Sequence, residues 1–330
     1  MIYTLMLSVY ALLFAGTAWK IGHSLTTHRL PTEVNSDTTF SHLQASQLVN
    51  GFDLAANAKT TTLMGDVRLP YSFRGTKANE LTDGECLDSF FQQLYQGEQC
   101  LRVLQIGDSH VRGNVLPNTL GQALKDAFGG QQLEGVDADA SPQPDGGIMF
   151  DYIGINGAHA SRFTETDMLE RIADFRPDLV VISFGTNEAH GHFDEDAHNI
   201  ILQALVDGIR AQRQDIAFVL TTPPGSYIAT RSGKRWRDRR GRWHGSTVRT
   251  PNHCTERVSA NIARFGHDHR IAVWNLFEIA GGDSYAYTNW RNAGLMQADQ
   301  IHYTASGYEL QGKLLGQAIV KAYHAFTDKR

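Results

Sequence analysis

The chain has 330 residues, of which 42% are apolar and 20% are charged, and its formal net charge is −5. This length suits one large domain or two small ones, and the apolar content excludes an intrinsically disordered chain. Only one uncharged apolar stretch approaches the length of a membrane span, which excludes a polytopic membrane protein. The mild acidity argues against a generic nucleic-acid-binding protein.

The N-terminal stretch, residues 2–19, carries no charged side chain and ends in small residues that offer a cleavage site after Ala18. We expect residues 1–22 to be an export signal, either cleaved or kept as a membrane anchor. The protein would then be exported, to the periplasm or the cell envelope. The alternative is a hydrophobic terminal helix packed on the domain. Residues 23–85 are polar and weakly periodic, which indicates an N-terminal extension or small cap.

Cysteine usage leaves the redox compartment open. The three cysteines, Cys86, Cys100 and Cys254, are too few for a disulfide scaffold and lack the spacing of a metal site. In an oxidising compartment a Cys86–Cys100 bridge is the most plausible pairing, and three thiols are the alternative.

Short apolar runs alternate with segments of helical periodicity from about residue 100 onward. The predicted strands cover residues 102–107, 148–155, 179–184, 216–221 and 271–276. The predicted helices cover residues 116–128, 167–175, 196–212, 255–267 and 306–326. This alternation predicts an α/β protein: a three-layer α/β/α sandwich with a five-stranded parallel sheet, flavodoxin-like, over residues 86–330. Such sheets bind ligands at the carboxyl ends of their strands.

Two glycine-containing turns follow the first two predicted strands. In Gly107–Asp108–Ser109–His110, a serine at a strand-to-helix turn exposes its hydroxyl and its own N–H, an oxyanion donor. The alternative is that Asp and Ser cap the helix. In the run 154–158, Gly-Ile-Asn-Gly-Ala, two glycines let the backbone approach a ligand closely. The alternative there is a tight turn.

Two further polar signals lie after the third strand and before the last helix. The Asn187 amide can donate to a developing oxyanion, or it can cap the next helix. Asp299 and His302 stand three residues apart, so the carboxylate can hold the imidazole tautomer while the other ring nitrogen faces a nucleophile.

The order Ser, Gly, Asn, Asp-x-x-His at successive strand ends resembles the SGNH (GDSL-type) hydrolase superfamily, over roughly residues 101–323. The resemblance implies the SGNH hydrolase fold, with Ser109 as nucleophile, His302 as general base and acid, and Asp299 as its orienting carboxylate. It also implies an oxyanion hole made of the Ser109 N–H, the Gly157 N–H and the Asn187 amide.

Two residues differ from the commonest pattern of the superfamily, and they point to one branch of it. His110 stands where the superfamily usually has leucine, and Glu188 follows Asn187 where aspartate is frequent. With the run 154–158, these residues look like the branch containing bacterial peptidoglycan O-acetylesterases. Fewer than 50 residues separate Ser109 from Gly157, too few for the carbohydrate-binding insert of some of those enzymes.

The expected function is therefore a serine esterase that hydrolyses O-acetyl or other short acyl esters on a cell-wall or other polysaccharide. The reaction would pass through an acyl-serine intermediate, with no metal and no cofactor. The open alternatives are a lipase- or thioesterase-type acyl hydrolase, a polysaccharide O-acetyltransferase, and a non-catalytic glycan-binding protein on the same fold.

A basic segment, residues 231–243, carries seven Lys or Arg and two Trp. We expect a lid-like insertion over about 225–252 that grips an anionic polymer, with Trp236 or Trp243 stacking on sugar rings. The alternatives are a solvated loop without a ligand and a nucleic-acid patch, which fits the overall acidity poorly.

Further side chains are candidates for binding a substrate or a metal ion. His110, Arg112 and Trp290 are further possible substrate contacts. The pairs His190–His192 and His267–His269 resemble metal-ligand spacings but lack a third ligand nearby in sequence, so no metal is predicted. The oligomeric state is left open.

Overall fold

The computed structural model describes residues 67–132 and 146–330, which lie in one compact unit, Phe52–Arg330. The expected export signal and most of the 23–85 extension lie outside the described residues. Within the described part of the chain, no helix has both the length and the apolar character of a membrane span.

A six-stranded, wholly parallel sheet forms the centre of this unit, in the order β2-β3-β1-β4-β5-β8. Its strands are β1 (Leu101–Gly107), β2 (Gly130–Gln132), β3 (Ile148–Gly154), β4 (Leu179–Ser183), β5 (Ala217–Thr221) and β8 (Ala272–Trp274). The five predicted strands are confirmed. The short edge strand β2 was not predicted, because its sequence, Gly-Gln-Gln, contains no apolar run.

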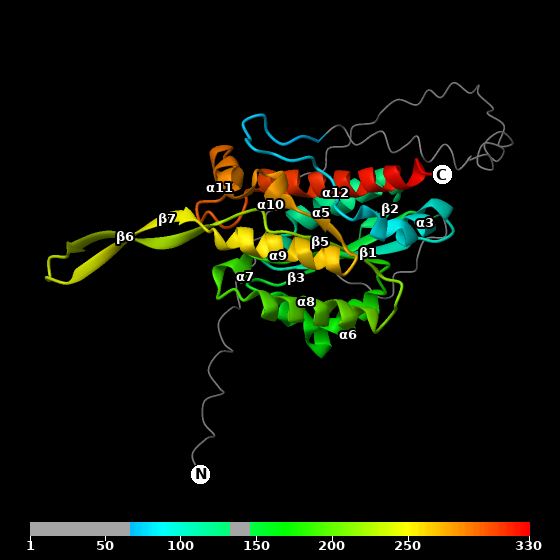
Figure 1. The fold of residues 1–330 in the computed structure, drawn as a ribbon, viewed down its shortest axis with the longest axis horizontal. Helices are drawn as coiled ribbons and strands as arrows, with labels where there is room; N and C mark the ends of the chain where they lie inside the picture. The colour runs from blue at the N-terminus through cyan, green and yellow to red at the C-terminus, as the bar shows by residue number, and fades with distance from the viewer. Residues whose placement is uncertain (1–66, 133–145) are drawn as a thin grey trace, which may run out of the picture. The chain divides into compact units, whose positions relative to one another are not determined.

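Helices cover both faces of the sheet (Figure 1). One face carries α3 (Asp88–Gln96), α5 (Val115–Phe128), α10 (Leu276–Ile279), α11 (Gly282–Asn292) and α12 (Ala305–Thr327). The other carries α6 (Thr166–Phe175), α8 (Glu195–Arg210) and α9 (Cys254–Asp268). The short helices are η2 (Gly84–Leu87), α4 (Ser109–Arg112), η3 (Ala160–Thr164) and α7 (Thr186–His190). The predicted three-layer α/β/α fold is confirmed.

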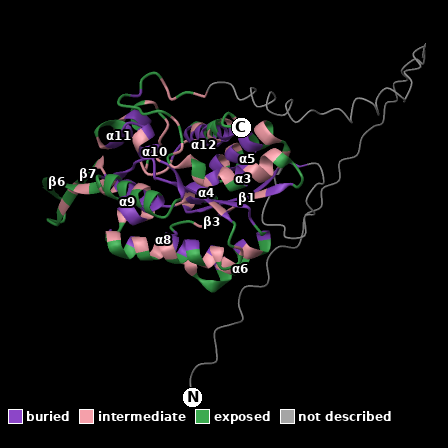
Figure 2. Cartoon of the chain, turned by 45° about the vertical axis from the view of Figure 1, so that its right-hand side comes forward, coloured by how far each residue is buried: buried purple, intermediate pink, exposed green. Residues whose placement is uncertain are grey.

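Strand periodicity explains why two helical layers are needed. Along β4, Leu179 and Val181 enter the core cluster beneath α5 and α12, whereas Val180 and Ile182 enter the cluster beneath α6 and α8. Successive side chains of a strand point to opposite faces, so a strand that is apolar throughout must be covered on both sides. Figure 2 shows the result, with the strands buried and the outward faces of α6 and α8 exposed.

Strand β1 lies where the strand order reverses: β2 and β3 lie on one side of it, and β4, β5 and β8 lie on the other. It pairs with β3 on one side and β4 on the other, and the register places Gly107 beside both Gly154 and Ser183. The segments that follow these three strands therefore begin at one level of the sheet. This is the crevice where open α/β sheets bind ligands.

The predicted insertion near residues 225–252 is an antiparallel hairpin of β6 (Tyr227–Arg237) and β7 (Trp243–Pro251). It projects from the body of the unit (Figure 1), so its shape is that of an arm rather than a lid.

The described part of the N-terminal extension packs on the same unit. Thr82 bridges to Val273 of the edge strand β8, and the Phe73 ring lies 5.1 Å from that of Trp290. The proposed boundary at residue 86 stays a prediction. No disulfide joins Cys86 to Cys100.

Candidate active site

A tight turn from β1 into α4 presents Ser109. Its shape depends on Gly107, because a Cβ at that residue would overlap the Val111 side chain and the carbonyl oxygen of Ser183. Asp108 caps α4, its Oδ1 accepting the N–H of His110 at 2.9 Å. Ser109 is thus the first residue of α4, and its N–H has no acceptor within the helix.

Ser109, His302 and Asp299 form one chain of hydrogen bonds. The Ser109 hydroxyl lies 2.9 Å from Nε2 of His302, although 193 residues separate the two. Nδ1 of His302 lies 2.6 Å from Oδ2 of Asp299. The contact expected between the hydroxyl and the imidazole therefore forms.

Asp299 also shapes the loop that carries His302. Its Oδ1 accepts the N–H groups of Ile301 at 2.9 Å and of His302 at 3.0 Å. Partial burial alone would raise the pKa of Asp299, but these hydrogen bonds and that from His302 outweigh it and hold the pKa at about 2. An ionised carboxylate can only accept, so His302 carries its proton on Nδ1. Nε2 is then free to take the serine proton.

An open cleft of about 500 Å³ lies in front of Ser109. Its lining residues come mainly from the segments that follow β1, β3 and β4: Ser109, Asn156, Gly157, Thr186, Asn187, His190, Ile301 and His302. Gly157 has a φ of +70°, a left-handed conformation that favours glycine. Among the described residues, none accepts a hydrogen bond from its N–H.

The Asn187 amide joins the turns after β1 and β3. Its Nδ2 donates to the carbonyl oxygen of Ala158 at 2.9 Å and to Oδ2 of Asp108 at 3.3 Å. An amide nitrogen has two hydrogens. To donate to an oxyanion in the cleft, Nδ2 of Asn187 would have to give up one of these two bonds. The bond given up would be the longer one, to Asp108.

Glu188 links the segments that follow β3 and β4. Its carboxylate accepts the Gly185 N–H and the Ala160 N–H, both at 2.9 Å. The two loops that carry Gly157 and Asn187 are therefore held by a shared buried carboxylate. Sequence reasoning noted Glu188 only as a departure from aspartate and missed this bridging role.

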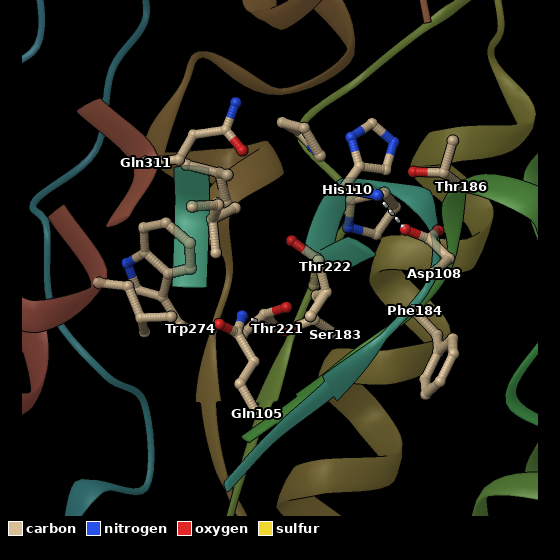
Figure 3. A pocket seen from close by; sticks show the side chains of 16 residues that line it. Gln105, Asp108, His110, Ser183, Phe184, Thr186, Thr221, Thr222, Trp274 and Gln311 are labelled. Atoms are coloured by element: carbon tan, nitrogen blue, oxygen red, sulfur yellow. Dashed lines mark hydrogen bonds between the residues drawn. The ribbon is translucent and has the colours of Figure 1, made fainter. Parts of the chain in front are cut away.

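Buried side chains lie next to the cleft, where Thr186 lines both the cleft and a smaller cavity (Figure 3). Asp108 and His110 line a cavity of about 30 Å³ there, together with Gln105 and Trp274. Nδ1 of His110 lies 2.9 Å from the hydroxyl of Tyr308, and its ring centroid lies 5.3 Å from that of His302. Burial lowers the pKa of His110 to about 3, so this ring is neutral at physiological pH.

A family model of GDSL-like lipases and acylhydrolases matches residues 106–310. The chain belongs to the GDSL-like lipase/acylhydrolase family. The resemblance to the SGNH (GDSL-type) superfamily is thereby confirmed. No curated protein matches the chain significantly.

This GDSL-family protein shares its fold with a solved peptidoglycan O-acetylesterase, and two further solved structures match it less well. A peptidoglycan O-acetylesterase superposes with a TM-score of 0.60 at 17% identity, covering 74% of this chain and 99% of that one. A GDSL-like lipase from Bacteroides thetaiotaomicron has a TM-score of 0.42 at 17% identity, covering 73% and 100%. An acetyl esterase mutant with acetate has a TM-score of 0.42 at 16% identity, covering 70% and 100%.

Several expected substrate contacts lie away from the cleft of this GDSL-family protein. Trp290 is fully buried in the core, packed between Phe73 and Tyr303, so it is not a substrate contact. His110 is buried and does not line the cleft, because its ring packs against aromatic neighbours rather than facing solvent. Arg112 is exposed and does not line the cleft.

The two tryptophans of the hairpin do not line the cleft either. Trp236 and Trp243 are exposed on the projecting arm. Conversely, sequence reasoning missed four cleft residues: Asn156, Thr186, His190 and Ile301. Of these, His190 had a usable signal, since it lies three residues after Asn187 and so on the same side of a helix.

The histidine pairs considered as metal ligands have other partners. Nε2 of His190 lies 2.9 Å from the Ser226 hydroxyl, and Nδ1 of His267 lies 3.2 Å from a carboxylate oxygen of Asp83. Within residues 67–132 and 146–330, no group of three His, Cys, Asp or Glu side chains is placed to hold a metal ion.

Asp108 makes the stability of the protein depend on pH. Burial raises its pKa to about 7, against the opposing hydrogen bond from the His110 N–H. The unfolded-state pKa is about 4, so the stability that comes from holding this proton is complete below pH 4. It is lost as the pH rises through 7. We therefore expect Asp108→Asn to gain stability relative to the wild type between pH 5 and pH 8, by about 3 kcal/mol.

Urea unfolding at the two pH values measures this difference. Asp167→Asn is the matched control, because the hydrogen bond from Arg162 lowers the pKa of Asp167 and this carboxylate stays ionised over the whole interval. A stability difference for Asp108→Asn that is the same at both pH values would contradict the prediction.

Proposed function

We propose that this GDSL-family protein is a serine esterase that removes O-acetyl or other short acyl groups from a cell-wall or other polysaccharide. The observation that carries this proposal is the chain of hydrogen bonds from Asp299 through His302 to Ser109, at the floor of an open cleft. Nucleophile, base and orienting carboxylate within hydrogen-bond reach are the arrangement that activates a serine hydroxyl.

The reaction follows from these positions. His302 takes the Ser109 proton as the hydroxyl oxygen attacks the ester carbonyl carbon. Oxyanion donors, each typically worth about 3 kcal/mol of barrier, then stabilise the tetrahedral intermediate. In this site they are the N–H groups of Ser109 and Gly157 and the amide of Asn187. The intermediate collapses to acyl-Ser109, and the alcohol leaves with the proton from His302. Water then attacks the acyl-enzyme by the same steps and releases the carboxylic acid.

The lining of the cleft favours a short acyl group on a polar substrate. Hydroxyl, amide and imidazole groups dominate it, and Ile301 is its single aliphatic side chain. A long acyl chain would need an extended apolar wall, so a lipase-type substrate fits poorly. The fold shared with a peptidoglycan O-acetylesterase supports an acetylated glycan.

Solvent access favours hydrolysis over acyl transfer to a sugar. The side chains of His302 and Asp299 are 35% and 39% exposed. Bulk water therefore reaches the base that must activate it, whereas a transferase has to exclude water from the acyl-enzyme.

We also propose that the protein works outside the cytoplasm, in the periplasm or cell envelope. The support is the apolar stretch of residues 2–19. Cell fractionation of the full chain, with N-terminal sequencing of the product, tests this: recovery of uncleaved protein in the cytoplasmic fraction would contradict it.

The substrate class is tested by acetate release from O-acetylated peptidoglycan and acetylated xylan, and by p-nitrophenol release from p-nitrophenyl palmitate. We expect release from one or both glycans and negligible cleavage of the palmitate. A fluorophosphonate probe should label the wild type at Ser109 and leave Ser109→Ala unlabelled. Preferred cleavage of the palmitate would overturn the short-acyl assignment, and labelling elsewhere would overturn the nucleophile.

Asn187→Ala tests the oxyanion donor. We expect kcat for p-nitrophenyl acetate to fall by about 10²–10³-fold with little change in KM, because the amide is needed only once negative charge develops. Since Asn187 also holds Ala158, a melting curve must accompany the kinetics. A loss carried by KM, or one matched by unfolding, would remove Asn187 from the oxyanion hole.

A further inference from the structure

The hairpin of β6 and β7 has a charge opposite to that of the rest of the chain. Residues 227–251 contain eight Lys or Arg and one Asp, a formal charge of +7. Because the whole chain carries −5, the remainder carries −12. The positive charge is therefore concentrated on one projecting element (Figure 1).

The strand register gathers much of this charge on one side of the hairpin. Paired residues of an antiparallel ladder share a face, and alternate residues along a strand share it too. The pairs Ala229–Arg249, Arg231–Thr247, Arg235–Gly245 and Arg237–Trp243 all lie on one such face. We define the basic face as Arg231, Arg235, Arg237, Arg249 and Trp243.

The bulge between Arg231 and Arg235 is what keeps this face continuous. Three residues of β6 lie opposite a single residue of β7 there, while β7 runs on without interruption. The opposite face carries no Lys or Arg in its regular pairs, which are Ile228–Thr250, Thr230–Val248 and Trp236–His244.

The cations of the basic face are free to meet an external anion. All four arginines are exposed. In the part of the chain that the structure describes, the hairpin's ion pairs join Asp238 to Arg242 and His244, and no carboxylate pairs with the basic face. The guanidinium groups of Arg237 and Arg235 lie 4.6 and 6.0 Å from the Trp243 ring centroid, so aromatic surface and positive charge are presented together.

The base of the hairpin is hydrogen-bonded to the loops of the candidate active site. The Tyr227 N–H donates to the carbonyl oxygen of Gln300 at 2.9 Å, between Asp299 and His302. On the other side, Ser226 lies 2.9 Å from Nε2 of the cleft residue His190. Asn252, just after β7, donates to the carbonyl oxygen of Ala189 at 2.9 Å.

The basic face therefore begins at the edge of the cleft. Its first arginine, Arg249, pairs with Ala229, two residues beyond Tyr227, whose N–H contacts the loop that carries His302. From there the arm extends for about 30 Å, with same-face residues about 7 Å apart along each strand.

We propose that the basic face is a docking track for an anionic polysaccharide, which it feeds toward Ser109. The inference rests on the proposed function and adds to it the charge of the substrate. A row of cations suits a polymer with repeated carboxylates, and Trp243 suits the apolar face of a sugar ring.

An anionic membrane is a poorer fit. The turn at the end of the arm contains Arg239, Arg240 and Arg242 and no apolar side chain, so it has nothing to insert among acyl chains. The two tryptophans lie on the sides of the ribbon, each with one ring face engaged, by His244 or by Arg237.

Binding is measured with full-length Ser109→Ala, which leaves the polymer intact, and polygalacturonate as the probe. The test variant is R231Q/R235Q/R237Q. Its matched control, K234Q/R239Q/R240Q, loses the same charge from the same hairpin outside the basic face. Three exposed ion pairs account for about a tenfold change in affinity, so we expect the dissociation constant to rise about tenfold in the test variant and less than about threefold in the control. Neutral dextran should not bind, and added salt should weaken polygalacturonate binding.

Kinetics on the Ser109-containing proteins separate docking from chemistry. We expect R231Q/R235Q/R237Q to raise KM for O-acetylated pectin and to leave p-nitrophenyl acetate turnover unchanged. Equal weakening of binding in both triple variants would overturn the assignment to one face. Tighter binding to phosphatidylglycerol vesicles or to a DNA duplex than to polygalacturonate would overturn the polysaccharide. Absence of p-nitrophenyl acetate turnover would overturn the esterase instead, while the binding result stands separately.

Discussion

Ser109→Ala is expected to lower kcat for p-nitrophenyl acetate by about 10⁴-fold or more. The hydroxyl is the atom that would become acylated, and no neighbouring group replaces it: removing it leaves only the oxyanion donors and substrate binding. Initial rates, corrected for the spontaneous hydrolysis of the ester, measure the effect.

The chain offers a control of the same chemistry. The Ser226 hydroxyl lies 2.9 Å from Nε2 of His190, the same distance as between Ser109 and His302. Ser226 is buried, and no carboxylate orients the other nitrogen of His190 within the described residues. We expect Ser226→Ala to retain activity within about tenfold. Comparable rates for Ser109→Ala and the wild type would leave a glycan-binding protein on this fold as the better account.

Asp299→Asn is expected to lower kcat by about 10³–10⁴-fold while the protein stays folded. The amide oxygen can still accept the backbone N–H groups of Ile301 and His302, so the turn should persist. The amide cannot stabilise the imidazolium that forms during attack, and its NH₂ favours the tautomer with the proton on Nε2. That tautomer cannot accept the Ser109 proton.

Asp283→Asn is the matched control for this carboxylate. Asp283 lies 2.6 Å from Nδ1 of His253, the same distance as in the Asp299–His302 pair, but neither residue lines the cleft. Its activity should match the wild type. An Asp299→Asn variant that keeps full kcat would show that His302 does not depend on a carboxylate, and the proposed proton path would fail.

Much of the fold could be predicted because its signals are local. The first four residues of the run Leu179–Ser183 are all apolar, which suits a strand covered on both faces and little else at that length. β2 was not predicted, because its pairing with β3, rather than its own residues, makes it a strand. In the same way, the 3.6-residue periodicity of α8 and α12 can be recognised from their own residues alone. The short helices α7 and α10 have too few residues to show such a pattern.

The same distinction between local signals and long-range contacts applies to the candidate site. The types of its residues and their places at strand ends are properties of short segments, so Ser109, Gly157, Asn187, Asp299 and His302 could all be named from the chain alone. Burial could not. Trp290 and His110 look like ligand contacts in one dimension, but they pack against rings that are distant in sequence, such as Phe73 and Tyr308.

The sequence by itself determined the strand and helix pattern, the family of the chain and the chemical groups available for catalysis, because each is written in a local run of residues. Only the tertiary structure decided which of those groups meet. The register of β1 with β3 and β4 brings three turns to one level, and the fold carries His302 to Ser109 across 193 residues. The register of the β6–β7 ribbon likewise decided that its arginines share a face. Contacts between distant segments depend on how whole elements pack, and no window of sequence contains that information.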